Sequence, residues 1–175
     1  MANVILYIAA SLDGYIARKD GGIDWLSMVE TPETDYGYAD FYRTVDAIVV
    51  GSKTYEQALG FDQWPYPGKT TYVFTRRELT TDRDDVVFTS ASPDAVISGI
   101  ESKGLSRIWL IGGAELTASF LRLRLVDEFI ISVIPIILGE GIPLFLHPYP
   151  EQRLKLNYAQ QYPTGLVQMS FSPAE

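Results

Sequence analysis

Two adjacent glycines, Gly112 and Gly113, separate an apolar run from a segment that favours a helix. The run, residues 108–111, ends at Ile111 and predicts a strand that leads directly into the glycines. Glycine lets the backbone approach a ligand without a Cβ in the way, and the first turn of a helix offers free N–H groups to an anion. The helix would open with Ala114, Glu115 and Leu116. This pattern indicates a phosphate or pyrophosphate site, although two glycines after a strand also form ordinary turns.

A second junction of the same kind occurs earlier in the chain. The apolar run 47–50 ends at Gly51, and a helical stretch begins with Ser52, Lys53 and Thr54. In an open α/β sheet such junctions lie at the carboxyl ends of strands, where neighbouring ones can share a ligand. The glycine spacing matches neither the Walker A loop nor the Gly-x-Gly-x-x-Gly motif. We therefore expect a shared ligand crevice that belongs to neither of these nucleotide-binding types.

The overall composition describes a globular chain with a single core. Its 175 residues are 47% hydrophobic and 21% charged, which predicts one domain over residues 1–175. No uninterrupted apolar stretch reaches about 18 residues, so no membrane-spanning helix is predicted. No basic region precedes the first apolar segment, so no signal peptide is predicted either. A cytoplasmic location is expected.

Charge and residue content exclude several classes of function. A net charge of −8 and an isoelectric point of 4.6 argue against nucleic acid or an anionic membrane as a partner. The chain has no cysteine and one histidine, which excludes disulfides and leaves too few ligands for a zinc site. The expected partner is a small molecule, with no bound metal. If this small molecule is an anion, basic side chains must be gathered locally at its site.

The elements that must position the two junctions alternate between strands and helices. Strands are expected at residues 3–10, 46–50, 69–75, 85–89 and 107–111, and helices at 36–44, 53–59, 93–102 and 114–121. The character then changes, with a β-rich run at 128–138 and two strands at 154–161 and 166–172, joined by a turn at 163–165. This succession predicts an α/β fold with a mixed sheet flanked by helices.

Five short motifs resemble, in order and spacing, those of the dihydrofolate reductase-like superfamily. They occupy residues 11–17, 51–54, 75–77, 111–115 and 138–145. The resemblance is closest to the reductase domain of the riboflavin-biosynthesis deaminase-reductase and its stand-alone relatives. It implies a three-layer fold with a central mixed, mostly parallel, eight-stranded sheet and flanking helices. It also implies NADPH across the strand ends and hydride transfer to a pterin- or ribosylaminopyrimidine-like small molecule.

The resemblance assigns the turn at Gly51, Ser52, Lys53 and Thr54 to the cofactor's phosphates. The Thr54 hydroxyl and backbone N–H groups would be the donors. The alternative for Ser52 is that it only caps its helix. Relatives often carry a cationic side chain directly after that glycine, whereas Ser52 stands here and Lys53 follows. This departure weakens the case for a contact between the turn and the 2′-phosphate.

Thr75, Arg76 and Arg77 correspond to the place where relatives meet the adenosine ribose and its 2′-phosphate. Guanidinium groups bind phosphate through paired N–H donors, so the two arginines favour NADPH over NADH. The alternative is a solvated pair that leads into a loop. In relatives the peptide bond that matches Gly112 and Gly113 is cis, and the helix that follows faces the pyrophosphate. Its residue Glu115 is expected to favour the helix dipole rather than contact the ligand.

Three residues are candidates for the substrate side, each with an alternative role. Asp13 follows the first strand and either faces the pocket or hydrogen-bonds its own turn. Trp25 resembles the tryptophan of the mobile loop that closes over nicotinamide and substrate in folate reductases, or it is a buried anchor for a long loop. Asp35 resembles the carboxylate that binds the pterin ring, or it starts the helix that follows. If Asp35 faces the pocket, desolvation should raise its pKa.

Other residues separate the chain from true folate reductases and from a fused deaminase. Lys69 stands where folate enzymes usually place an arginine that grips the glutamate tail, and lysine lacks the paired donors. The His-x-Glu and paired-cysteine signature of the zinc deaminase is absent. The alternative to a reductase is a nucleotide-binding module of the same fold without catalytic turnover.

A homodimer formed partly through the C-terminal strands is also expected. Residues 129–138 are apolar at nine of ten positions, counting Pro135, so both faces of this strand need cover. A central strand under helices would explain this pattern within one chain. Pro135 removes a ladder donor and places the strand at a sheet edge or a bulge, where one face would be exposed. A partner subunit would cover that face, and riboflavin-type relatives are commonly dimers.

Overall fold

The computed structural model describes residues 1–174. Its strands are β1 (Asn3–Ser11), β2 (Tyr15–Ala17), β3 (Ala47–Gly51), β4 (Thr70–Phe74), β5 (Val86–Thr89), β6 (Arg107–Gly112), β7 (Glu128–Ile134), β8 (Ile142–Pro143), β9 (Leu154–Gln161) and β10 (Val167–Pro173). Its helices are the 3₁₀ helix η1 (Asp24–Val29), α1 (Tyr38–Thr44), α2 (Ser52–Leu59), α3 (Pro93–Glu101) and α4 (Ala114–Arg122). In the described part of the chain, no helix has the length and apolar character needed to cross a membrane.

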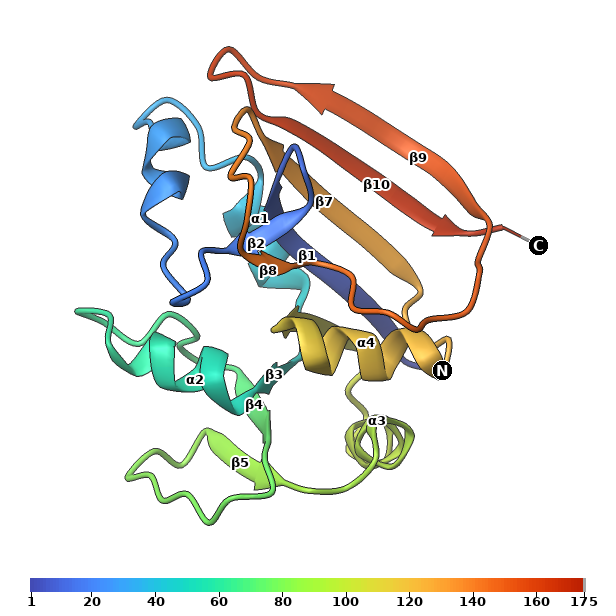
Figure 1. The fold of residues 1–175 in the computed structure, drawn as a ribbon. Helices are drawn as coiled ribbons and strands as arrows, with labels where there is room; N and C mark the ends of the chain where they lie inside the picture. The colour runs from blue at the N-terminus through green and yellow to red at the C-terminus, as the bar shows by residue number, and fades with distance from the viewer. Residues whose placement is uncertain (175) are drawn as a thin grey trace.

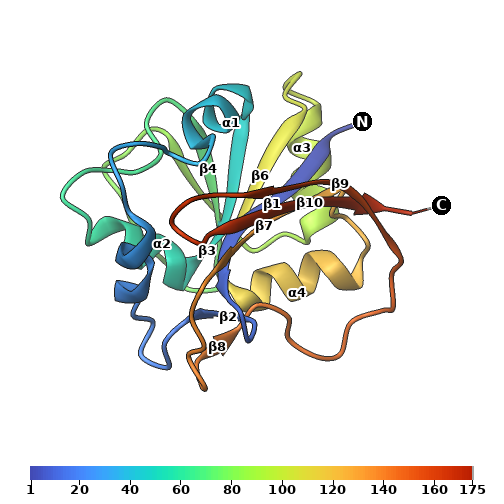
Figure 2. The same ribbon diagram turned by 90° about the horizontal axis from the view of Figure 1, so that it is seen from above.

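The main sheet lies between two layers of helices (Figures 1 and 2). On one face, Phe41 of α1 and Ala58 of α2 belong to one buried cluster. On the other face, Ile100 of α3 packs in a second cluster with Leu116 and Phe120 of α4. Strands under cover on both faces can be apolar throughout, and residues 47–50 of β3 are fully buried.

Eight strands cross the sheet in the order β5, β4, β3, β6, β1, β7, β10 and β9. The first six are parallel, whereas β10 runs antiparallel to β7 and β9 antiparallel to β10. The chain leaves β1 through α1 and enters β3, which lies on the far side of β6. It leaves β6 through α4 and enters β7, which lies on the far side of β1. Two adjacent strands whose connections run in opposite directions mark the point where α/β sheets bind ligands. The predicted three-layer α/β fold with a mixed, mostly parallel, eight-stranded sheet is confirmed.

Two local predictions were wrong. The strand expected to extend through residue 138 ends at Ile134, before Pro135, and β7 lies between β1 and β10 rather than at an edge. Strand β10 therefore occupies the edge of β7 that was expected to be open. The helix expected from residue 36 begins at Tyr38, because Tyr36 and Gly37 have positive φ angles of 58° and 80° that no helix continues.

Candidate cofactor and substrate site

The two glycine junctions lie side by side at the carboxyl edge of the sheet. Strands β3 and β6 are parallel neighbours, and Val50 pairs with Gly112. A Cβ placed on Gly51 would lie 3.5 Å from the backbone nitrogen of Gly113, so the two turns are in contact. This register brings the two junctions together, as a shared crevice requires, and the crevice itself stays a prediction.

Each junction leads directly into a helix whose first turn lacks a side-chain cap. Gly51 and Gly113 are the N-cap residues of α2 and α4, and no side chain hydrogen-bonds either turn. Ser52 is therefore the first residue of α2, and the alternative role as its cap was wrong. Free N–H groups of two adjacent helices favour an anionic ligand such as a pyrophosphate.

The glycine pair is enclosed by threonine hydroxyls. A Cβ on Gly113 would lie 3.2 Å from Oγ1 of Thr54, and a Cβ on Gly112 would lie 3.6 Å from Oγ1 of Thr117. Thr117 is fully buried, and its hydroxyl has no hydrogen-bond partner among residues 1–174. The Gly112–Gly113 peptide bond is cis, as the resemblance implied. Close backbone, uncapped helix turns and an unpaired hydroxyl fit a nucleotide cofactor.

The helix after the glycines offers its backbone rather than its side chains. Ala114 and Leu116 are buried against the sheet, and Ile111 is half-buried at the end of β6. Glu115 is exposed in the first turn, where a carboxylate suits the positive end of the helix dipole.

The basic segment after β4 reaches the same edge. Phe74 pairs with Gly51, so Thr75 and the two arginines follow next to the first junction. The Thr75 hydroxyl accepts a hydrogen bond of 3.0 Å from the backbone N–H of Arg77. The Arg77 guanidinium donates to a Glu56 carboxylate oxygen 2.9 Å away, whereas Arg76 is exposed and forms no ion pair within the described chain. Arg76 is thus the cation better placed to meet a phosphate.

A cavity opens where β1 and β6 separate. The two strands pair only as far as Leu6 and Leu110, after which β1 follows β7 alone. The cavity has a volume of about 380 Å³, and we call it the inner pocket. Its walls are formed by Tyr7, Ile8, Ala9, Leu26, Val29, Asp35, Tyr36, Tyr38, Trp109, Ser132, Ile134 and Leu166. Its lining residue Ile8 has its Cδ1 3.6 Å from the position that a Cβ on Gly112 would take, and this side chain packs against the cluster that contains Leu116 and Phe120.

Asp35 lines the inner pocket and also holds the start of α1. Its carboxylate accepts hydrogen bonds from the backbone N–H groups of Ala39, at 2.9 Å, and Gly37, at 3.0 Å. These bonds lower the pKa of Asp35, so the expected rise in its pKa was wrong. The helix-start role is present, whereas binding of a ring by this pocket-lining residue stays a prediction.

The other two substrate-side candidates lie outside the inner pocket. The Asp13 carboxylate accepts from the Ser11 hydroxyl at 2.6 Å and from the backbone N–H of Gly139 at 2.7 Å, which ties two loops together. These bonds lower its pKa. Trp25 is 3% exposed and packs with Ile134 and Leu166, so it has the position of a buried anchor. Of the three candidates, the structure brings only Asp35 to the cavity.

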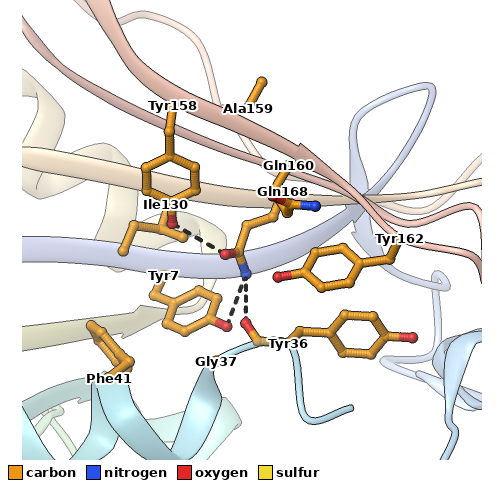
Figure 3. A pocket seen from close by; sticks show the side chains of 10 residues that line it. All are labelled: Tyr7, Tyr36, Gly37, Phe41, Ile130, Tyr158, Ala159, Gln160, Tyr162 and Gln168. Carbon is orange, nitrogen blue, oxygen red and sulfur yellow. Dashed lines mark hydrogen bonds between the residues drawn. The ribbon is translucent and has the colours of Figure 1, made fainter. Parts of the chain in front are cut away.

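A second cavity of about 380 Å³ adjoins the first, and here sequence reasoning had identified none of the residues (Figure 3). We call it the tyrosine pocket. It is lined by Tyr7, Tyr36, Gly37, Phe41, Ile130, Tyr158, Ala159, Gln160, Tyr162 and Gln168. Buried Gln168 is at its centre, on the strand pattern Val-Gln-Met-Ser-Phe of β10. A polar residue at an inward position of such a strand was the available signal.

Comparison with known proteins agrees with this architecture. The family model of the RibD C-terminal domain matches residues 2–168. The chain belongs to this family. A curated relative is the uncharacterized protein YwjB of Bacillus subtilis, which is 44% identical over 161 residues, covering 91% of this chain and 92% of that protein.

Two solved structures illustrate the likeness within this family. A putative riboflavin biosynthesis protein from Shewanella sp. PV-4 superposes with a TM-score of 0.91 at 31% identity, covering 100% of both chains. The diaminohydroxyphosphoribosylaminopyrimidine deaminase/5-amino-6-(5-phosphoribosylamino)uracil reductase of Thermotoga maritima has a TM-score of 0.76 at 16% identity, over 99% of this chain and 57% of that chain. The latter likeness concerns the fold alone. Membership of the RibD C-terminal domain family confirms the resemblance found in the motifs.

Proposed function

We propose that this RibD C-terminal domain protein is an NADPH-dependent reductase of a pterin- or ribosylaminopyrimidine-like ring. The observation that carries the proposal is that Ile8 lines the inner pocket and has its Cδ1 3.6 Å from the position that a Cβ on Gly112 would take. A ring in this pocket lies beside the place where the cofactor would bind. The reduced nicotinamide supplies the hydride when NADPH is bound.

Residues of this chain would then bind and orient the two ligands. The first turns of α2 and α4 offer N–H groups to the pyrophosphate, and Thr54 adds a hydroxyl. Exposed Arg76 would meet the 2′-phosphate. The ionised Asp35 carboxylate accepts hydrogen bonds from ring N–H or amino groups, which fixes the orientation of the ring. Apolar walls such as Leu26 and Ile134 exclude water from it.

The second candidate is a nucleotide-binding module without turnover. The lowered pKa of Asp35 favours it, because an ionised carboxylate holds no proton to deliver to the ring. The two candidates share the cofactor site and differ in chemistry, so one set of measurements separates them.

Two measurements test the proposal. Addition of NADPH at a hundredfold excess over Kd should raise stability by about 2.7 kcal/mol, or roughly 5 to 10 °C in Tm. NADPH oxidation is then followed by absorbance with pterins, ribosylaminopyrimidines and small carbonyl compounds. Turnover of a ring compound supports the reductase. Binding of NADPH without any turnover supports the module, and an unchanged Tm at millimolar NADPH contradicts both.

We also propose that the protein is a cytoplasmic homodimer in which β9 contributes to the interface. This strand forms one edge of the main sheet, and all of its residues are exposed. Leu154 is 42% exposed and Leu156 is 52% exposed. An uncovered edge with apolar side chains is a natural place for a second copy to pair.

A further inference from the structure

The inner pocket and the tyrosine pocket share two walls. Tyr7 of β1 and Tyr36, just before α1, line both cavities. A ligand whose ring occupies the inner pocket can therefore extend past these two side chains toward β9 and β10. The tyrosine pocket is the space available to the part of the substrate that does not react.

A network of uncharged groups forms the floor of the tyrosine pocket. The Gln168 side-chain nitrogen lies 3.1 Å from the Tyr7 hydroxyl, 3.2 Å from the Ser132 hydroxyl and 3.4 Å from the Tyr36 carbonyl oxygen, so its two N–H protons are shared among three acceptors. The Gln168 oxygen accepts from the Tyr158 hydroxyl at 3.1 Å. Figure 3 shows the Tyr7 hydroxyl, the Tyr36 carbonyl and the Tyr158 hydroxyl converging on Gln168. The amide is thereby fully engaged and fixes the hydroxyls around it.

The network leaves hydroxyl protons free to face a ligand. The Tyr7 hydroxyl oxygen accepts a hydrogen bond from Gln168, and within residues 1–174 the hydroxyl proton of Tyr7 has no acceptor. Burial raises the pKa of Tyr7 to about 12, so the phenol keeps this proton at neutral pH. Tyr162 stands at the rim and packs edge-to-face on Tyr36, with ring centroids 4.8 Å apart. The pocket thus combines neutral donors with aromatic surface.

Cations are missing from both pockets. Within the described residues, no Lys, Arg or His lines either cavity, and Asp35 is the one charged lining side chain. A phosphate monoester carries nearly two negative charges and is usually met by Arg or Lys, or by helix N–H groups. Gly37, the N-cap of α1, lines the tyrosine pocket, but the N–H groups of Gly37 and Ala39 already donate to the Asp35 carboxylate. In a chain of net charge −8, the described lining of the two pockets therefore offers no cation to a phosphate. The candidate phosphate contacts, Thr54 and Arg76, belong to the cofactor edge.

We propose that the substrate of this protein is not phosphorylated: it carries its reacting nitrogen heterocycle in the inner pocket and an uncharged, hydroxyl-bearing substituent in the tyrosine pocket. This inference rests on the proposed function and narrows its substrate class. The Thermotoga maritima protein is named for a phosphoribosyl substrate, so the substrate that we infer for this chain differs from that substrate by one phosphate group.

A matched pair of compounds tests the inference. 5-Amino-6-(5-phosphoribosylamino)uracil and the same compound without its phosphate are titrated calorimetrically into the full chain saturated with NADP⁺. We expect the dephosphorylated compound to bind at least about tenfold more tightly, the loss expected for an unpaired charged group. Equal or tighter binding of the phosphorylated compound overturns the inference and leaves the proposed reductase standing. If neither compound binds, the ring assignment of the proposed function fails, and the inference fails with it.

A second test of the inference adds a positive charge to the tyrosine pocket. Gln160→Arg places a cation on the pocket-lining face of exposed β9 and should shift the preference toward the phosphorylated compound by about tenfold. Gln161→Arg is the matched control, because successive strand residues face opposite sides and Gln161 lines neither cavity. Equal shifts in the two variants, or no shift in Gln160→Arg, contradict the placement of the substituent.

Discussion

The Gln168 side chain donates a hydrogen bond to the Tyr7 hydroxyl at 3.1 Å, although the two residues lie 161 positions apart in the chain. We predict that Tyr7→Phe weakens binding of the heterocyclic substrate about tenfold, seen as a higher KM, because the ligand loses a donor. The free energy of unfolding should fall by about 0.5 to 1.5 kcal/mol, since Gln168 keeps two acceptors.

Tyr42→Phe is the control for this change. It removes a hydroxyl that donates to the Pro67 carbonyl oxygen at 2.9 Å, outside both pockets. A similar loss of stability with an unchanged KM is expected. An equal rise in KM for both variants would show that Tyr7 acts only through the fold.

The Asp35 carboxylate should orient substrate without holding a proton. Asp35→Asn keeps a side chain that can start α1 but removes the charge, so we predict a rise in KM of about tenfold. The folded-state pKa of Asp35 is lowered, so its stabilising contribution is present above its usual value of 3.8 and is lost as pH falls through the lowered value. The variant should therefore be less stable than the wild type at pH 7, and the difference should vanish in acid.

Asp40→Asn, on the helix α1 that Asp35 precedes and outside both pockets, should leave KM unchanged. Urea titrations across the acid range measure the stability difference. A KM that is insensitive to Asp35→Asn removes this residue from the substrate site.

Gly113→Ala should abolish NADPH binding in a folded protein. Its φ of −72° accommodates alanine, but the new methyl group would lie 3.2 Å from the Thr54 hydroxyl, inside the proposed pyrophosphate site. Gly99→Ala in α3 is the control, because its Cβ meets no atom within 4 Å and should stabilise the helix by about 0.5 to 1 kcal/mol. Calorimetric titration with NADPH, alongside circular dichroism, measures both. Retained affinity in Gly113→Ala would place the cofactor elsewhere.

The two arginines after β4 should contribute unequally to cofactor choice. Arg76→Ala should weaken NADPH binding roughly 10- to 150-fold and leave NADH binding nearly unchanged, because a charge-assisted contact to the 2′-phosphate is lost. Arg77→Ala should weaken NADPH binding less, since Arg77 is already paired with Glu56. The affinities of both variants for NADPH and NADH test this difference. Equal losses for NADPH and NADH in Arg76→Ala would mean that this arginine does not recognise the 2′-phosphate.

The dimer should depend on the edge strand. Light scattering at micromolar concentration should give twice the monomer mass of 19.6 kDa, and Leu156→Lys should restore the monomer. Leu59→Lys, at an equally exposed leucine of α2, should not. Ile134→Glu should unfold the chain rather than split a dimer, because Ile134 is 1% exposed inside its own subunit. A monomeric wild type would refute this interface.

The cofactor edge was readable from the sequence because its signals are local. Gly51 and Gly113 each end an apolar run and precede a helix, and parallel pairing then brings them together. The position of β7 was misjudged because Pro135 was taken as part of the strand, whereas it follows the last strand residue. Tyr7 was missed because it sits in an apolar strand, and Gln168 because it alternates with apolar residues as a solvent-facing residue would. Only tertiary pairing reveals their contact. The sequence singled out Asp13 but not its hydrogen-bond partner Gly139, because the two residues are far apart in the chain.

The separation of β1 from β6 leaves the Tyr7 carbonyl without a strand partner on that side, and the indole N–H of Trp109 donates to it at 3.0 Å instead. Trp109 also lines the inner pocket, whereas the chain's other two tryptophans, Trp25 and Trp64, line neither cavity. We therefore expect its emission to change when a ring replaces water in the pocket. Trp109 would then report binding even of compounds that are never reduced.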